Sequence, residues 1–209
     1  MEREAVRKTR ARRGEGDLLR DEIIEATRQL LVETGDANAI TVRMISDRVG
    51  VTPPSIYMHF PSKADVIYEC CGVLFEEFTE HLERAVEDLE EPLDRLVAMG
   101  RAYVHFGLEH PELYRILFMT VPSEQPEGYD VQEMLQKGGF MALVAVVTEL
   151  ITVGGIRSDD PIKVSLGLWA LAHGITSLMI AHHHVPWPEV EEMIDHQIGA
   201  YLHGLTATA

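Results

Sequence analysis

The amino-acid sequence predicts an all-α protein. Apolar residues recur at helical spacing along most of the chain, and no run alternates apolar and polar residues over the length of a strand. Residues that typically begin or end helices, such as Thr, Ser, Gly and Pro, separate these periodic segments. With 209 residues, 46% of them apolar, the chain can build one large domain, or one large and one small domain.

The first periodic segment begins near residue 18 and ends at Gly35. Its apolar stripe consists of Leu19, Ile23, Ala26 and Leu30, joined by Ile24, Thr27 and Leu31. Residues 1–17 precede it, and we expect them to form a flexible basic arm. The arm either follows DNA phosphates, reaches into a minor groove or is simply solvated, and its basic residues are Arg3, Arg7, Lys8, Arg10, Arg12 and Arg13.

A short helix is predicted after Thr41, which is placed to cap it. Ile40 and Ile45 flank the cap as a hydrophobic staple, and Val42, Ile45 and Val49 supply the buried side. Gly50 ends this helix.

A second short helix is predicted after Thr52. Pro53 stands at its first position, where a missing N–H is harmless, and Val51 with Ile56 repeats the staple. Pro61 disfavours helical geometry at Phe60, so this helix spans only about two turns.

Ser62 and Asp65 resemble a capping box that opens a longer helix. Its buried stripe is predicted to be Val66, Ile67, Cys70, Leu74, Phe78 and Leu82. Beyond Pro92 we expect helices near 93–109, 111–120, 130–154, 160–183 and 187–205, with a loop at 122–128.

Two short helices joined through a Gly turn form a helix-turn-helix pattern, in which the second helix can enter a major groove. Hydroxyl groups of Thr41, Thr52, Ser55 and Tyr57 are able to donate to phosphate oxygens, and Lys63 adds a positive charge. The alternative is that Tyr57 and Phe60 are core residues and that the threonines only cap helices. We assign Phe60 to the core.

The run ITVRMISDRVGVTPPSIYMHFPSKADVIYECC resembles the DNA-binding domain of the TetR family of transcriptional regulators, and the likeness extends over about 18–75. The resemblance implies a DNA-binding domain at 18–62 and a ligand-binding and dimerisation domain at 63–209. It implies that Met58 helps to set sequence preference, for example through a thymine methyl group. The DNA-contacting residues it implies are Thr41, Arg43, Thr52, Pro53, Ser55, Tyr57, Met58, His59 and Lys63.

Charge is distributed unevenly along the chain. The formal net charge is −16, yet residues 1–63 hold 11 Lys and Arg against 10 Asp and Glu. The rest of the chain is therefore strongly acidic, which argues against its lying on DNA.

Near the C-terminus, LWALAHGITSLMI resembles the signature of the WHG subclass of the family. Trp169 and His173 are four residues apart and share a helix face, while Gly167 and Gly174 are expected to allow close helix approach. The surrounding helix is apolar nearly all round, so we expect burial on both sides. The resemblance implies a homodimer through the last two helices, the final one contributing Val190, Met193, Ile194, Ile198 and Tyr201.

A small-molecule effector is expected to bind among the helices of the C-terminal part. Thioethers and aromatic rings with few polar groups favour an apolar or aromatic compound, although each of these residues taken singly is more often a packing residue. Besides Met134, the candidates are Met99, Tyr103, Phe106, Phe118, Met119, Phe140, Met141, Trp169 and His173. A charged effector stays open because His105, Glu109 and His110 can face inward.

The sequence gives little support to a metal-binding protein or an enzyme. His182, His183 and His184, and the pair Glu192 and His196, are interpreted as structural or solvated rather than as metal ligands, and no cofactor is predicted. Nucleotide-binding loops, a GxSxG elbow and a CxxC pair are absent from the sequence, so an enzyme is not expected.

The compartment follows from the cysteines and the hydropathy pattern. Adjacent Cys70 and Cys71 suit a reducing compartment, and no segment is interpreted as a signal peptide or membrane span. The sequence therefore predicts a cytoplasmic, homodimeric, ligand-responsive repressor that binds a palindromic operator. The alternative is a small-molecule sensor on the same fold that does not bind an operator, and an all-α enzyme using His173 is a third hypothesis.

Overall fold

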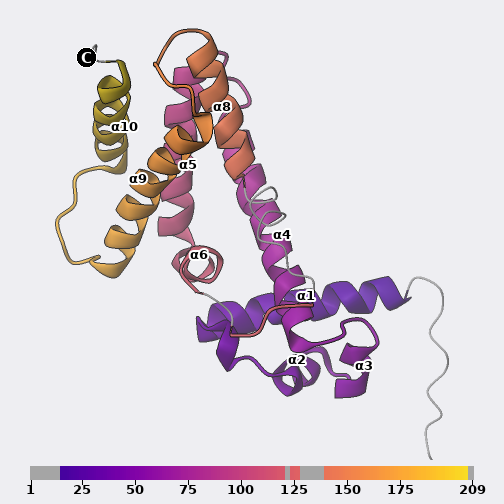
Figure 1. Ribbon diagram of the computed structural model, residues 1–209. Coiled ribbons are helices and arrows are strands. Elements are labelled where there is room, and N and C mark those ends of the chain that lie inside the picture. Colours follow the sequence, from indigo (N-terminus) through magenta and orange to yellow (C-terminus); the bar gives the residue numbers. More distant parts are fainter. Residues whose placement is uncertain (1–14, 121–122, 128–138, 207–209) are drawn as a thin grey trace, which may run out of the picture. The chain divides into compact units, whose positions relative to one another are not determined.

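The computed structural model describes residues 15–120, 123–127 and 139–206, all of them helical or in connecting turns and loops (Figure 1). The basic residues of the expected arm, and Met134, lie outside these ranges. The chain divides into two compact units. We call residues 1–70 with 122–126 the head, and residues 71–121 with 127–209 the body.

The head is a small helical unit. It contains α1 (Glu15–Thr34), a 3₁₀ turn η1 (Ala37–Ala39), α2 (Val42–Val49), α3 (Pro53–Tyr57) and the first turns of α4 (Lys63–Arg84). Its core includes Ile23, Leu31, Ile40, Ile45 and Ile56, all fully buried. Both predicted staples therefore have a member in this core, and α1 begins at Glu15, slightly earlier than expected.

The turn between α2 and α3 depends on Gly50. Its φ of 79° lies in the left-handed region, where a side chain is strained. In this conformation the N–H of Gly50 and the N–H of Val51 both donate to the carbonyl oxygen of Ser46, at 2.9 and 3.0 Å. The glycine closes α2 and turns the chain into α3.

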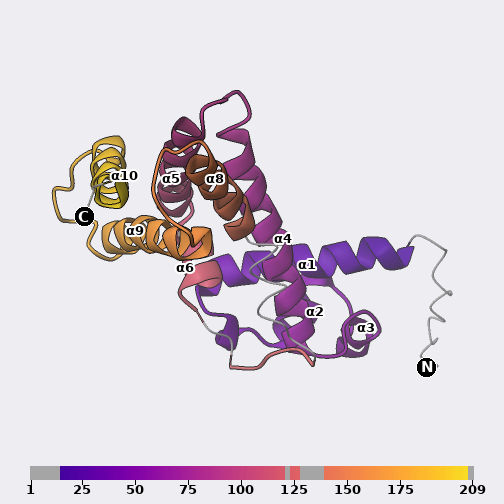
Figure 2. The same ribbon diagram turned by 45° about the horizontal axis from the view of Figure 1, so that its top comes forward.

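The body is arranged around one central helix. Its helices are α5 (Pro92–Glu109), α6 (Pro111–Phe118), α8 (Phe140–Thr152), α9 (Pro161–Ala181) and α10 (Val190–Thr206), with the last turns of α4. α5 contacts α6, α8, α9 and α10 (Figure 2). The predicted stripe of α4 from Val66 to Leu82 is buried throughout. The predicted helices after Pro92 agree within a few residues, and the start of the one expected at 130–154 lies outside the described residues.

Helix α9 is the one described helix that is long and apolar enough to cross a membrane by length and composition. One side of it packs in the body through Val164, Ser165, Leu168, Ala172 and Ile175. The core helix of a soluble protein passes the same length test, so the feature is weak evidence for a span. The expected burial of both sides is not seen within one chain, because Ile162, Leu166 and Leu178 are exposed.

Two expectations for the C-terminal helices are corrected. Val190, Ile194 and Ile198 of α10 are buried within their own chain, so they are not free to meet a partner; Ile194 and Ile198 lie beside Gly100 of α5. Gly167 does allow close approach, since an added Cβ would lie 2.2 Å from the hydroxyl of Tyr201. At Gly174 an added Cβ would meet no described atom within 4 Å, so that glycine makes no close helix contact within its own chain.

Candidate nucleic-acid interface and buried polar cluster

Helix α2 of the head presents two polar residues at its start. Thr41 is its N-cap, and its Oγ1 accepts from the N–H of Met44 at 3.2 Å, which leaves the hydroxyl proton available for an outside acceptor. Arg43 is well exposed, and its Nε lies 3.7 Å from an Asp47 carboxylate oxygen one turn on. A long exposed pair of this kind is weak, so the guanidinium is able to exchange its partner for a phosphate.

Helix α3 begins after Thr52 with Pro53 at its first position, as predicted. Thr52 makes no side-chain cap: its hydroxyl pairs with the hydroxyl of Ser55 at 3.0 Å. Two hydroxyl groups in contact have one proton beyond the one they share, so the pair can still donate outward. Thr52 and Pro53 are exposed and Ser55 is half-buried.

The end of α3 separates core from surface within five residues. Ile56 and Phe60 are buried, at 0% and 2% exposure, whereas Tyr57 and Met58 are 52% and 83% exposed. The assignment of Phe60 to the core is confirmed, and the Arg20 guanidinium lies over its ring at 5.2 Å. This alternation directs Tyr57 and Met58 away from the head.

His59 and Lys63 complete the predicted set, and both are half-buried. Lys63 is the first residue of α4, just after the N-cap Ser62. Ser62 and Asp65 form the predicted capping arrangement: the Asp65 N–H donates to Ser62 Oγ at 3.3 Å, and Ser62 Oγ donates to the Asp65 carboxylate at 2.6 Å. None of the nine residues proposed from the sequence to contact DNA is buried.

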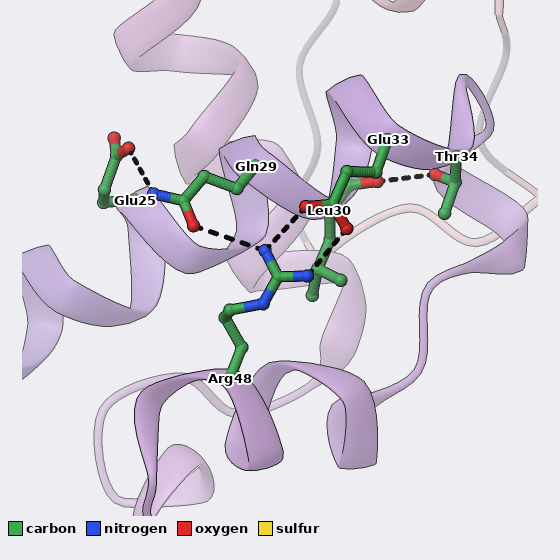
Figure 3. A network of polar contacts seen from close by, with 6 residues as sticks. All are labelled: Glu25, Gln29, Leu30, Glu33, Thr34 and Arg48. Atoms are coloured by element: carbon green, nitrogen blue, oxygen red, sulfur yellow. Dashed lines mark hydrogen bonds and ion pairs between the residues drawn. The ribbon is translucent and has the colours of Figure 1, made fainter.

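A side-chain network that sequence reasoning missed ties α2 to α1 (Figure 3). Both terminal nitrogens of Arg48 donate to the Glu33 carboxylate, at 3.0 and 2.6 Å, and one of them reaches Gln29 at 3.3 Å. Gln29 donates in turn to Glu25 at 2.9 Å. The Arg48 hydrogen bond lowers the pKa of the Glu33 carboxyl group. Arg48 is in the last turn of α2, so the network fixes the part of α2 next to the Gly50 turn.

The body contains a polar cluster of four aromatic residues. Tyr114 Oη lies 2.6 Å from Nδ1 of His173 and 3.2 Å from Tyr103 Oη. Tyr103 Oη lies 3.3 Å from the same Nδ1 and accepts from Trp169 Nε1 at 3.2 Å. The cluster joins α5, α6 and α9, because Tyr103 and Tyr114 are buried on the first two and Trp169 and His173 are half-buried on the third.

Burial keeps this cluster uncharged. Desolvation raises the pKa of Tyr103 strongly and raises the pKa of Tyr114 to about 12. The same effect lowers the pKa of His173, since its charged form is the one that loses hydration. Both phenols and the imidazole are therefore neutral near pH 7.

Aromatic rings surround the cluster. Tyr103 and Tyr114 each contact Phe118, and Phe78 packs edge-on against Tyr103 at a centroid distance of 5.4 Å. The ring centroid of Trp169 lies 5.9 Å from that of Phe140 and 6.3 Å from that of His173. The second contact confirms that Trp169 and His173 share a helix face, as predicted.

The predicted effector residues divide into two groups. Tyr103, Phe118, Phe140, Trp169 and His173 come together, and Phe106 joins through Phe78. Met119 and Met141 are exposed, and Met99 is buried one helical turn before Tyr103 on α5. Tyr114 and Phe78 were not among the effector residues predicted from the sequence. Tyr114 could have been found, because it lies in the buried stripe of 111–120 and a buried Tyr hydroxyl needs a hydrogen-bond partner.

Metal and thiol chemistry receive no support from the described residues. Among them no group of three or more His, Cys, Asp or Glu could hold a metal ion, and the three consecutive histidines 182–184 are exposed just after α9. Neither Cys70 nor Cys71 is in a disulfide, and burial raises the pKa of Cys71 to about 11, so its reactive thiolate is disfavoured.

Comparison with known families assigns both units. Residues 23–70 match the model for bacterial regulatory proteins of the tetR family, and residues 96–201 match the tetracyclin repressor-like C-terminal domain. The chain belongs to the TetR family. It is thus a DNA-binding transcriptional regulator and not an enzyme. The C-terminal match does not name the WHG subclass, so that resemblance stays a prediction.

Similar proteins agree with membership of the TetR family. The nucleoid occlusion factor SlmA of Vibrio campbellii is 32% identical over 98 residues, which is 47% of this chain and about half the length of SlmA. The uncharacterized HTH-type transcriptional regulator YobS of Bacillus subtilis is 23% identical over 188 residues, 88% of this chain and 90% of YobS. The solved structure of RolR in complex with resorcinol shares the fold, with a TM-score of 0.67, 13% identity and coverage of 95% and 92%.

Proposed function

We propose that this TetR-family regulator is a ligand-responsive repressor that binds a palindromic operator as a homodimer and is released by a small, largely apolar or aromatic effector. The observation that carries the proposal is the exposure of Tyr57 and Met58 at the end of α3, the second helix of the helix-turn-helix, whose Ile56 is buried. An exposed aromatic and thioether pair at the end of such a helix suits insertion into a major groove.

The nine head residues fall into two roles. Thr41, Arg43, Thr52, Ser55 and Lys63 carry the donors that bind phosphate oxygens and set the register of the head on the duplex. Pro53, Tyr57, Met58 and His59 meet base edges or the sugar surface, and Met58 supplies apolar contact to a thymine methyl group.

The effector site is proposed for the body, at the polar cluster. Aromatic rings with a small number of grouped polar atoms are typical of small-molecule sites. The solved structure of RolR, which shares the fold, contains the neutral aromatic diol resorcinol as its ligand. Trp169, His173 and Gly174 also carry the WHG resemblance, and we propose that the body belongs to that subclass.

One feature supports dimerisation through the C-terminal helices, and it lies on α9. Ile162, Leu166 and Leu178 are exposed apolar residues, spread over the side of α9 that lies opposite its buried residues. A second copy covering this face around a two-fold axis would bury it and would place two heads on two half-sites. The proposed compartment is the cytoplasm, where the operator lies.

Release of DNA is proposed to depend on α4, whose first turns belong to the head and last turns to the body. An effector that binds better to the state with wrongly spaced heads lowers operator affinity by its differential affinity for that state. Phe78 of α4 contacts Tyr103 and Phe118, so α4 reaches the proposed effector site.

The test is a gel shift with duplex DNA flanking the protein's own gene, titrated at several salt concentrations. Tyr57→Ala and Lys63→Ala are expected to weaken a sequence-selective complex. Because each dimer carries two copies of Lys63, its removal should reduce the salt slope of log K by about two. Lys163→Ala, which removes an exposed lysine of the body, is the matched control and should change neither affinity nor slope.

The alternative function, a sensor that binds small molecules without an operator, is distinguished by the same experiment. Such a protein would retard DNA only weakly and without sequence preference, and the three variants would retard it as much as the wild type does. Affinity of Tyr57→Ala and Lys63→Ala equal to that of the wild type, in a selective complex, would remove these residues from the interface.

A further inference from the structure

The hydrogen bonds of the polar cluster determine which ring nitrogen of His173 carries the proton. Trp169 Nε1–H can only donate, and it donates to Tyr103 Oη at 3.2 Å. The Tyr103 proton must then find an acceptor, and the two within reach are Tyr114 Oη at 3.2 Å and His173 Nδ1 at 3.3 Å. A buried hydroxyl proton without an acceptor costs about 1–3 kcal/mol, so one of these bonds forms.

The shortest contact sets the direction of the chain. The 2.6 Å separation of Tyr114 Oη and His173 Nδ1 is within the range for an O–H donor and is shorter than the usual range for an N–H donor. Outside the tyrosine pair, the Tyr114 hydroxyl has two further partners, the backbone oxygen of His173 at 3.5 Å and the side chain of Thr176, but its short contact is the one with Nδ1. The hydroxyl of Tyr114 therefore donates to Nδ1, and the order is Trp169 to Tyr103 to Tyr114 to His173.

An imidazole that accepts at Nδ1 and is neutral carries its proton on Nε2. No described residue forms a hydrogen bond with Nε2 of His173, whose side chain is only half-buried. We infer that His173 presents Nε2–H as the donor for a neutral effector that carries an acceptor oxygen on an aromatic or apolar framework. The inference deepens the proposed function and rests on it for the location of the effector site.

The charges of the body favour a neutral effector over an anion. Arg95 and Arg101 of α5 pair with Glu149 and Asp195, and Arg115 of α6 pairs with Glu112. On α9 the only cation is Lys163, ten residues or about 15 Å of helix away from His173. A carboxylate at Nε2 would thus lose hydration without gaining a positive partner, which is costly in a partly buried site.

The first experiment measures the tautomer in the protein without any ligand. Long-range ¹⁵N–¹H correlation spectra of the full chain, labelled on histidine, are expected to show His173 with the proton on Nε2. The double variant Tyr103→Phe/Tyr114→Phe removes both hydroxyl donors and should give a mixture of tautomers. Tyr201→Phe removes a phenol elsewhere in the body and should leave the spectrum unchanged. A dominant Nδ1–H form in the wild type overturns the inference.

The second experiment uses matched fragments. Acetophenone has an acceptor oxygen, ethylbenzene has the same framework without it, and benzoate is the anion. Titration should shift Nε2 with acetophenone, and benzoate should bind more weakly. His173→Asn keeps an acceptor near the Nδ1 position but has no donor at the Nε2 position, so acetophenone should bind about three- to tenfold more weakly. His173→Gln returns an amide donor near the Nε2 position and should recover part of the loss.

Ethylbenzene is the control for packing, and its affinity should be the same in wild type and in His173→Asn. Equal acetophenone affinity in wild type and His173→Asn, tighter binding of benzoate, or no shift with acetophenone at its solubility limit contradicts the inference. None of these readouts involves DNA. A failed gel shift therefore refutes the repressor proposal and leaves the assignment of Nε2–H as the donor standing. Failed fragment binding refutes the donor assignment and leaves the repressor proposal standing.

Discussion

His173 couples the protonation of the polar cluster to the stability of the body. In an unfolded chain its pKa is about 6.5, and burial lowers the pKa in the folded protein. Between these two values the unfolded state binds more protons, so stability rises with pH in that window and is lost as pH falls from above 6.5. Tyr103 and Tyr114, which face the ring, stay protonated throughout because their pKa values are raised.

We therefore expect wild type to lose more stability than His173→Asn between pH 7.5 and 5.5. The difference should be well below the one-proton limit of about 1.4 kcal/mol per pH unit, because solvent screens a half-exposed ring. Urea unfolding at both pH values measures it, and the other nine histidines are common to both proteins. Parallel losses in the two proteins would show that His173 is not the group responsible.

Met58 is the residue at which sequence selectivity is expected to change without loss of the fold. It is exposed and follows α3, so Met58→Ala removes no core packing. Binding selections on randomised operators should show a relaxed preference at one position in each half-site, worth about 1 kcal/mol per half-site. A uniform loss over all sequences, with the preference unchanged, would instead indicate that Met58 contacts the backbone of the duplex.

At the scale of the element, Arg48 is a test of how α2 is held on α1. Arg48→Gln and Glu33→Gln are each expected to weaken operator binding by about two- to fivefold at low salt, because either change frees the end of α2 beside Gly50. The double variant should bind no more weakly than the single variants, since they break one interaction. Arg157→Gln in the body is the control. Additive losses would mean that Arg48 contacts DNA by itself.

Gly107 permits the close approach of α5, α6 and α9 at the polar cluster. An added Cβ would lie 2.2 Å from Thr176 Cγ2 and 2.9 Å from Tyr114 Cδ2. Gly107→Ala should thus destabilise the protein by about 1–3 kcal/mol in urea unfolding. At Gly72 in α4 an added Cβ meets no described atom within 4 Å, so Gly72→Ala should be neutral or stabilising by up to about 1 kcal/mol. Equal effects of the two changes would contradict the close packing at Gly107.

The elements were largely predictable because their boundaries are local chemistry. Thr41, Gly50, Pro53 and the Ser62–Asp65 pair mark helix ends through contacts within a few residues, and the structure shows each of them at a helix end. The partners of Arg48 and Tyr114 were not predictable, since Glu33 and His173 lie 15 and 59 residues away. Nor does the periodicity of α10 reveal whether its apolar stripe faces α5 or a second chain. That is why Ile194 and Ile198 were assigned to the wrong surface.

At the scale of the whole molecule, the two units differ in charge, and so do their proposed partners, which are anionic DNA for the head and a neutral effector for the body. The nearly balanced N-terminal segment carries the head, and the acidic remainder of the chain carries the body, so attraction to phosphates is confined to the head. Tight binding by so few contacts per head requires two heads on one operator, because linking two sites raises the overall affinity by about 10²–10⁴. Operator binding should consequently depend on the dimer.

The exposed face of α9 provides the test of that dependence. Glutamates in the double variant Leu166→Glu/Leu178→Glu would place charges inside a two-fold interface without disturbing the buried side of the helix. Light scattering after size exclusion should give the 23.5 kDa monomer for this variant and twice that mass for wild type, and operator affinity should fall about a hundredfold or more. Val153→Glu, at an exposed apolar residue just after α8, should remain dimeric. A wild-type monomer that still protects both half-sites would refute the two-fold arrangement.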